Sequence, residues 1–406
     1  MSASRREFLR YGAGLSFVTL GGAVPGLLAR AAEESARVAR TDGVLVVVEL
    51  TGGNDGLNTL VPIGDSRYNK ARPTLGIPAK DAIRLTDQFG FHPRMAAMAE
   101  LFKEGRLAVV QGVGYPEPDR SHFRSMEIWH TASLAKRPFA AGWLGKYLDA
   151  TVPEQGREPL RGLALAGPLP QALRGEKGSS PVLGQLDALS TEADVDLMRR
   201  KLANGPGASQ GPLAFLRQQA SSAYQVADRL KAATAAESSP VEYPQGELGD
   251  QLRQAAKILA LDVGSRVIYA SQGGYDTHSE QANEHGELLG TLAQSLAAFD
   301  KDLAARKLAD RVIVLVFSEF GRRVEENASR GTDHGAASCA FLMGRGVRGG
   351  LAGRHPGLDT LDEGDLIHTT DFRSVYATLL QRWLGCSPIA VLGREFPMLD
   401  LIGVPG

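Results

Sequence analysis

The sequence predicts an α/β protein with a mostly parallel central sheet that helices flank on both faces. The first observation is a set of short, unbroken apolar runs at residues 44–50, 106–112, 160–166, 266–271 and 311–317. Continuous hydrophobicity is typical of strands that are covered on both faces, and such strands usually form parallel sheets. The second observation is that helical periodicity fills the gaps between these runs, which indicates alternating strands and helices.

The helical segments follow from apolar residues spaced three and four apart. We predict helices at residues 92–105, 190–204, 210–236, 247–262, 283–306 and 371–384. The stretch 151–185 is rich in proline and glycine, and the stretch 237–249 is polar. We therefore expect a mainly helical insertion around residues 185–250 within a single domain that spans residues 42–406.

Composition excludes some classes of function. The chain has 406 residues, a formal net charge of -1 and no long basic block, which argues against nucleic acid as a partner. Only two cysteines are present, Cys339 and Cys386, and they can build neither a disulfide framework nor a cysteine-rich metal site.

The N-terminus carries a targeting pattern. The segment SRREFLR (Ser4 to Arg10) precedes a glycine-rich, mildly apolar stretch and the small-x-small site Ala29-Arg30-Ala31. This resembles a twin-arginine signal peptide over residues 1–31, and it implies the twin-arginine translocase as a partner during export. Glycines and Pro25 interrupt the stretch, so we expect no stable membrane span. The expected location is periplasmic or extracellular.

Polar side chains follow the predicted strands at their carboxyl ends, where open parallel sheets place functional residues. They are Asn54, Asp55, Asn58, Arg120, Ser121, His122, Asp276, His278, Glu319, Asp333 and His334. Each has an ordinary alternative: Asn54-Asp55-Gly56 suits a turn, Ser121 suits a helix N-cap, and Glu319 suits an ion pair with Arg322 or Arg323. Because so many of these polar residues are expected at the same edge of the sheet, we predict a functional site there.

Imidazole nitrogen and carboxylate oxygen together favour a divalent metal, with zinc preferred and calcium, magnesium or manganese as alternatives. The predicted ligands are Asp55, Asp276, His278, Glu319, Asp333 and His334. Ser121 at a helix N-terminus is the predicted nucleophile, since backbone N–H groups there favour anions. Arg120 and Arg124 are predicted to bind the ester oxygens, and Asn54 and Asn58 to contact substrate. His285 is expected on a solvated helix face.

Five segments resemble a known bacterial family of exported proteins, domain of unknown function 1501, over essentially the whole chain. They are VELTGGNDGLNTLVP, YPEPDRSHFRSMEIWHTA, YDTHSEQ, FSEFGRR and GTDHGAAS. Their order is also similar to the alkaline phosphatase and sulfatase superfamily. That resemblance implies an alkaline-phosphatase-like fold, with Asp55, Asp276, His278 and His334 as metal ligands and Ser121 as nucleophile.

The chain departs from that superfamily at three places, one of which is the spacing of Asp276 and His278, which is shorter than the usual one. Glu319-Phe320 stands where the superfamily has Asp-His, so the resemblance implies that one nitrogen ligand is missing. No cysteine lies near position 121, so sulfatase chemistry that depends on a modified cysteine is not expected.

Three interpretations of function follow. The leading one is an exported metal-dependent hydrolase of phosphate or sulfate esters, acting on a small-molecule or polymer substrate with Ser121 as nucleophile. The alternative is a catalytically degenerate metal- or ligand-binding envelope protein of the same fold. In the third, the polar loops form a surface for a partner protein.

Overall fold

The computed structural model describes residues 43–136, 140–151, 160–177, 180, 182 and 239–403. The predicted signal peptide, the predicted helices at 190–204 and 210–236, and most of the predicted insertion lie outside the described residues. Among the residues that the structure does describe, no helix combines the length and the apolar character needed to cross a bilayer.

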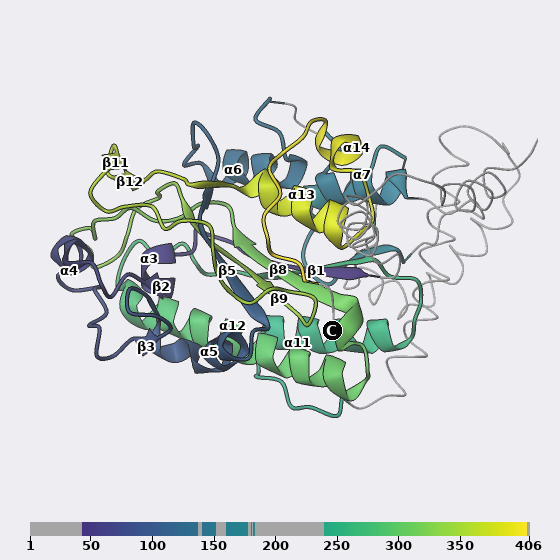
Figure 1. Cartoon of the computed structure of the whole chain (residues 1–406), viewed down its shortest axis with the longest axis horizontal. Helices are drawn as coiled ribbons and strands as arrows, with labels where there is room; N and C mark the ends of the chain where they lie inside the picture. The colour runs from purple at the N-terminus through teal and green to yellow at the C-terminus, as the bar shows by residue number, and fades with distance from the viewer. Residues whose placement is uncertain are drawn as a thin grey trace, which may run out of the picture. The chain divides into compact units, whose positions relative to one another are not determined.

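An eight-stranded sheet forms the centre of the described fold (Figure 1). Its order is β10-β5-β9-β8-β1-β7-β6, and β13 also pairs with β5. Only β9 runs antiparallel to its neighbours, β5 and β8, so the prediction of a mostly parallel sheet is confirmed. The strands are β1 (Val44–Leu50), β5 (Leu107–Gly114), β6 (Gly162–Ala164), β7 (Val267–Gln272), β8 (Val312–Ser318), β9 (Ser338–Met343), β10 (Gly350–Ala352) and β13 (Thr370–Asp371).

The central strand β1 shows why the apolar runs are continuous. Val46 and Val48 pack in the core on one face of the sheet, whereas Leu45 and Val47 pack in the core on the other face. All four are at most 1% exposed. Burying each such side chain contributes about 1.5–3 kcal/mol, so both faces of the strand favour apolar residues.

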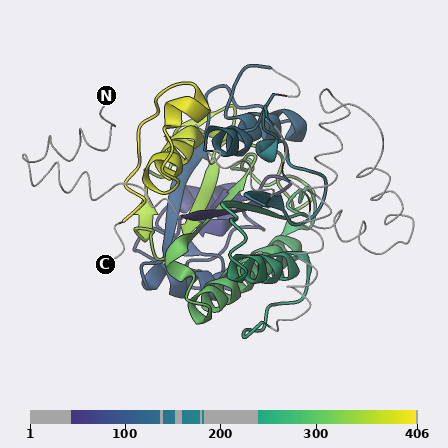
Figure 2. The ribbon, with the colours of Figure 1, turned by 90° about the vertical axis from the view of Figure 1, so that its right-hand side faces the viewer.

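Two helical layers cover the sheet, one on each face (Figures 1 and 2). Helices α5 (Ala96–Lys103), α11 (Glu247–Ala260) and α12 (Gln281–Ala305) lie on one side. Helices α6 (His122–Thr131), α7 (Trp143–Ala150), α13 (Phe372–Arg382) and α14 (Pro388–Leu392) lie on the other. Four predicted helices, at 92–105, 247–262, 283–306 and 371–384, correspond to α5, α11, α12 and α13.

Smaller elements complete the described fold. Helices α3 (Gly56–Thr59) and α4 (Ser66–Ala71) follow β1. A three-stranded sheet contains β2 (Leu60–Val61), β4 (Gly90–Phe91) and β3 (Ile83–Arg84). Strands β11 (Leu361–Asp362) and β12 (Asp365–Leu366) form a two-stranded sheet, and single 3₁₀ turns occur at Pro93–Met95, Gln171–Leu173 and Ala309–Arg311.

The direction of the strands places the polar segments at one edge of the sheet. Strands β1, β5, β7 and β8 run in the same direction, so their carboxyl ends meet at the same edge. Because β9 runs in the opposite direction, its first residue, Ser338, lies at that edge as well. The segment just before β9, with Asp333 and His334, thereby joins the segments that follow the parallel strands.

Candidate metal centre

Three donors from three segments meet at this edge. His122, Asp276 and His334 each offer a ligand atom, and these atoms all lie within 4.8 Å of one another. The Asp276 carboxylate is 2.9 Å from His334 Nε2 and 3.5 Å from His122 Nε2. His278 adds a fourth donor, because its Nε2 lies 3.0 Å from both Asp276 Oδ1 and His334 Nε2. We call these four residues the His/Asp cluster.

His122 owes its orientation to Glu319. The His122 Nδ1–H donates to Glu319 Oε1 at 2.8 Å, since a carboxylate can only accept, and this bond raises the pKa of His122. Glu319 is 1% exposed and is itself held by the N–H of Gly52 at 2.9 Å and the hydroxyl of Ser318 at 3.0 Å. The remaining nitrogen, Nε2, faces the cluster, and it is buried without a hydrogen-bond partner. Glu319, predicted as a ligand, is instead committed to His122, Gly52 and Ser318.

Asp276 is held by a buried arginine. The Arg322 guanidinium donates to Asp276 Oδ1 at 2.7 Å and to the carbonyls of Gly53, Thr332 and Tyr275 at 2.7, 2.6 and 2.9 Å. Partial burial would raise the pKa of Asp276, but its contacts with His334 and Arg322 lower it to about 2. Asp276 is therefore a fixed, ionised carboxylate.

The two remaining imidazoles are fixed through their other nitrogens. His334 Nδ1–H donates to the carbonyl of Arg120 at 2.8 Å, which aims Nε2 at the cluster. His278 Nδ1–H donates to Asp333 Oδ1 at 3.2 Å, and Asn327 donates to the same oxygen. Asp333, predicted as a possible ligand, thus orients His278, and the bond from Asn327 lowers the pKa of Asp333.

Glycines after β1 allow the loop that follows β1 to approach the loops that follow β7 and β8 closely. Gly52 and Gly53 have φ values of 119° and 80°, in the region that favours glycine. A Cβ at Gly52 would lie 2.4 Å from the backbone nitrogen of Asp276, and one at Gly53 would lie 2.4 Å from the Phe320 ring. Phe320 itself packs against His122 and His334, with ring centroids 4.9 and 4.8 Å apart.

Asp55, a predicted ligand, contacts a different set of groups. It is 1% exposed and caps α3, where Oδ1 accepts the N–H groups of Leu57 and Asn58 at 3.2 and 3.3 Å. Its Oδ2 lies 2.6 Å from Arg72 Nη1 and 2.5 Å from Gln281 Nε2. Burial would raise the pKa of Asp55, but the charges of Arg72 and His285 and the hydrogen bonds from Arg72 and Gln281 together outweigh it, so the net shift is downward. Both oxygens are committed to holding the loop after β1.

The two predicted substrate contacts are buried beside Asp55. Asn58 donates to the carbonyl of Leu75 at 2.9 Å and accepts from the Tyr68 hydroxyl at 2.7 Å. Asn54 accepts from His285 Nε2 at 2.9 Å, and both residues are at most 1% exposed. The expectation of a solvated His285 is wrong, because that face of α12 packs against the loop after β1 rather than facing water.

The side chains of the three predicted catalytic residues do not converge on one site. Ser121 is exposed at the N-cap of α6, next to His122, and its side chain makes no capping hydrogen bond. The Arg120 guanidinium instead pairs with Asp365 at 2.6 Å, beside a pocket of about 610 Å³. Arg124 pairs with Glu127 at 2.6 Å. Neither guanidinium contacts the cluster.

Sequence reasoning named two residues of this site, His122 and Arg322, without assigning either of them a role in it. His122 follows Ser121 directly, and its position at a strand-to-helix junction is the signal that could have singled it out. Arg322 was considered only as an ion-pair partner for Glu319, whereas it binds Asp276. Nothing local in the segment FGRR distinguishes the buried Arg322 from the half-exposed Arg323.

Solved structures of other proteins resemble this chain distantly. A protein in the alkaline phosphatase superfamily from Vibrio parahaemolyticus is 10% identical at a TM-score of 0.41, covering 89% of this chain and 72% of that chain. A sulfatase from Pseudoalteromonas sp. is 10% identical at a TM-score of 0.40, and the match covers 89% of this chain and 70% of that chain. The C-terminal periplasmic domain of EcEptC from Escherichia coli, in a complex with Zn, is 11% identical at a TM-score of 0.36. The match covers 73% of this chain and 72% of that chain. TM-scores below 0.5 assign no activity to this chain.

Comparison with functionally curated proteins yields no match. The family model described as "Protein of unknown function (DUF1501)" matches residues 43–384, which include every residue of the His/Asp cluster. The match bears out the family resemblance drawn from the five sequence segments. The chain belongs to the DUF1501 family.

Proposed function

We propose that this protein is a metal-dependent hydrolase of phosphate or sulfate esters, with zinc in the His/Asp cluster and Ser121 as the nucleophile. One observation carries the proposal: His122, Asp276, His278 and His334 direct hydrogen-bond acceptor atoms at one another. In the neutral rings no N–H group lies between these acceptors. The protein's own contacts support this assignment.

The hydrogen bonds that each ring makes through Nδ1 show which nitrogen carries the proton. His122, His278 and His334 donate their Nδ1–H to acceptors that can only accept, namely Glu319, Asp333 and the carbonyl of Arg120. In the neutral rings each Nε2 is therefore an acceptor. The Nε2 atoms of His278 and His334 nevertheless lie 3.0 Å apart, and both lie within 3.0 Å of the ionised Asp276. Lone pairs at this spacing repel unless an added proton or a metal cation lies among them.

The donor set fits zinc. Histidine nitrogens and a carboxylate oxygen are common zinc ligands, and two ligands of a tetrahedral zinc lie about 3.3 Å apart. Glu319 and Asp333 provide the carboxylate partners that metal-bound histidines usually have. The buried, unpartnered Nε2 of His122 is the atom that a cation would satisfy.

The remaining residues position an ester. Ser121 precedes α6, whose N-terminal N–H groups and dipole favour an anionic group. Its hydroxyl is not committed to a cap, so it is free to attack. Because Arg120 and Arg124 are paired elsewhere and Arg322 is committed to Asp276, the site itself supplies little positive charge to an ester. A bound divalent cation would polarise the ester and supply that charge.

Metal analysis combined with hydrolysis assays tests the proposal. Wild-type protein should carry metal and cleave an aryl phosphate or an aryl sulfate. His334→Ala should lose metal and turnover together, whereas Ser121→Ala should keep metal and lose turnover. Ser387→Ala is a matched control, because Ser387 is also an exposed N-cap without a side-chain capping bond. Metal-free wild-type protein, or full turnover in Ser121→Ala, contradicts the proposal.

We also propose that the protein acts outside the cytoplasm after twin-arginine export. The pair Arg5-Arg6 before Phe8 and Leu9 supports this location. Replacing both arginines by lysine should retain the chain in the cytoplasmic fraction of the producing cells. Equal amounts of the wild type and this variant in the exported fraction exclude the twin-arginine route.

A further inference from the structure

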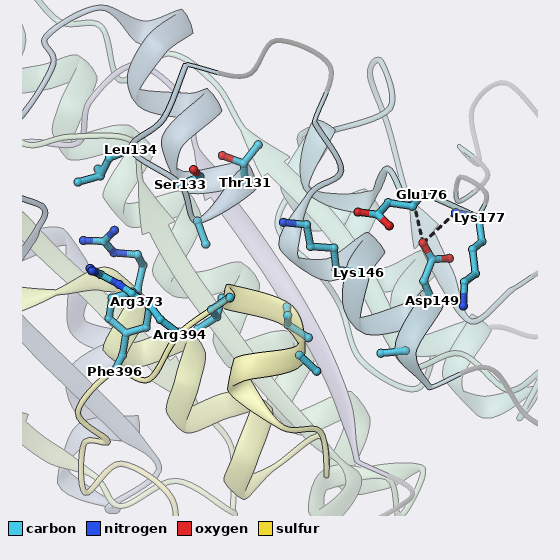
Figure 3. Close-up of a pocket in the computed structure, with 16 residues that line it drawn as sticks. Thr131, Ser133, Leu134, Lys146, Asp149, Glu176, Lys177, Arg373, Arg394 and Phe396 are labelled. Carbon is cyan, nitrogen blue, oxygen red and sulfur yellow. Dashed lines mark hydrogen bonds between the residues drawn. The ribbon is translucent and has the colours of Figure 1, made fainter.

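A second pocket lies on the other helical layer, at the C-terminal end of α6 (Figure 3). Its volume is about 660 Å³, which is the size of a pocket for an organic small molecule. The wall includes Thr131 at the end of α6, whereas His122 of the His/Asp cluster begins the same helix. Nine residues of α-helix correspond to about 14 Å, so the two sites are separate.

One wall of the pocket holds an arginine that is fixed before any ligand binds. Arg373 is 3% exposed, and its Nε and Nη2 donate to Asp371 at 2.9 and 2.6 Å. Its guanidinium also stacks on Phe396, 4.8 Å from the ring centroid. The third nitrogen, Nη1, donates to none of the described residues. A guanidinium held in this way loses little side-chain entropy when it binds an oxyanion.

Further cations lie around Arg373 without carboxylate partners. Arg394 contacts the same Phe396 ring at 4.6 Å, and it forms no ion pair with the described residues. Lys146 likewise forms none, and Figure 3 shows it pointing from α7 toward the side on which the two arginines lie. Arg373 is paired with Asp371, but the charges of Arg394 and Lys146 have no carboxylate partner among the described residues, which favours binding of an anion beside them.

The acidic residues of the pocket do not cancel this charge. Asp149 Oδ2 accepts the backbone N–H groups of Glu176 and Lys177 at 2.6 and 3.0 Å, so its charge is engaged on the far wall (Figure 3). Glu176 and Lys177 line that wall together and carry opposite charges. Apolar side chains of Leu134, Val391, Leu392 and Phe396 also line the pocket.

We propose that this pocket binds an organic molecule that carries a phosphate, phosphonate or sulfate group, in addition to any ester that is bound at the His/Asp cluster. The oxyanion lies among Arg373, Arg394 and Lys146, where guanidinium groups offer paired N–H donors. The organic part contacts Leu134 and Phe396. This site does not depend on metal.

Calorimetric titration with phenylphosphonate and with inorganic sulfate tests the proposal. Phenylphosphonate is a suitable probe because a hydrolase of esters does not cleave its C–P bond. It should bind more tightly than sulfate, since its ring also contacts the apolar wall. Arg394→Ala and Lys146→Ala should each weaken phenylphosphonate binding by about tenfold. Both variants should keep wild-type ester hydrolysis and metal content.

Two controls separate this pocket from the metal centre and from general charge effects. His334→Ala should retain phenylphosphonate binding at this pocket while losing metal. Arg354→Ala removes an exposed arginine outside the pocket and should bind the probe like wild type. The proposal is overturned if wild type does not bind the probe, if His334→Ala abolishes binding, or if Arg354→Ala weakens binding as much as Arg394→Ala does.

Discussion

Replacing Asp55 by asparagine tests whether this carboxylate holds the fold or binds metal. Asparagine keeps the cap of α3, since its oxygen still accepts the N–H groups of Leu57 and Asn58. The change removes the charge that faces Arg72 at 2.6 Å, in a pair whose side chains are 1% and 0% exposed. Leaving a buried charge without its partner costs about 3–5 kcal/mol, and the retained cap places the expected loss near the lower end, about 3 kcal/mol.

Urea unfolding followed by tryptophan fluorescence measures this loss. All three tryptophans, Trp129, Trp143 and Trp383, are at most 3% exposed, so their emission reports on the core. Asp65→Asn is the matched control, because Asp65 caps α4 and pairs with Arg67 at the surface, and it should change stability little.

A double variant and a metal measurement complete the test. Asp55→Asn combined with Arg72→Met removes both buried charges and should regain part of the lost stability. Metal content should stay at the wild-type level in Asp55→Asn. Wild-type stability together with lost metal would show that Asp55 is a ligand and that the reasoning from its contacts is wrong.

Three further predictions concern buried groups. Burial lowers the pKa of His285 to about 4, so the unfolded chain binds a proton that the folded protein excludes, and stability falls as the pH drops from 6.5 toward 4. Between pH 7 and pH 5 this loss is about 2 kcal/mol, and His285→Gln should remove it from urea unfolding curves. Glu319→Ala frees the His122 ring and should weaken metal affinity by about 10–100-fold in a chelator competition, whereas an unchanged affinity would rule out the orienting role. Burial raises the pKa of Cys339 to about 12, so a thiol reagent should label this residue only after unfolding, and rapid native labelling would refute its burial.

Several elements could be predicted from local sequence. The run at 44–50 matches β1, and the runs at 266–271 and 311–317 lie within one residue of β7 and β8. Apolar side chains on both faces leave few alternatives to a buried parallel strand. The same reasoning correctly located the polar segments that follow β1, β5, β7 and β8, whereas the segment with Asp333 and His334 precedes β9.

The partners within the site could not be predicted in this way. Asp55 and Asp276 both follow a strand, yet Asp55 pairs with Arg72 in the interior, whereas Asp276 faces three imidazoles. Glu319 follows a strand as well, but its buried position allows it only to support His122. Spacing along the chain does not encode these differences, because each depends on how far a side chain lies from the rim of the sheet.

The sequence by itself determined the covered strands and the segments that carry imidazole and carboxylate groups, since burial on two faces and strand-end polarity are local patterns. Only the tertiary structure decided which of these groups meet. The antiparallel direction of β9 places His334 beside Asp276, 58 residues earlier, and packing of α6 aims His122 at both. Contacts between segments so distant in the chain are set by how the strands pair and the helices pack.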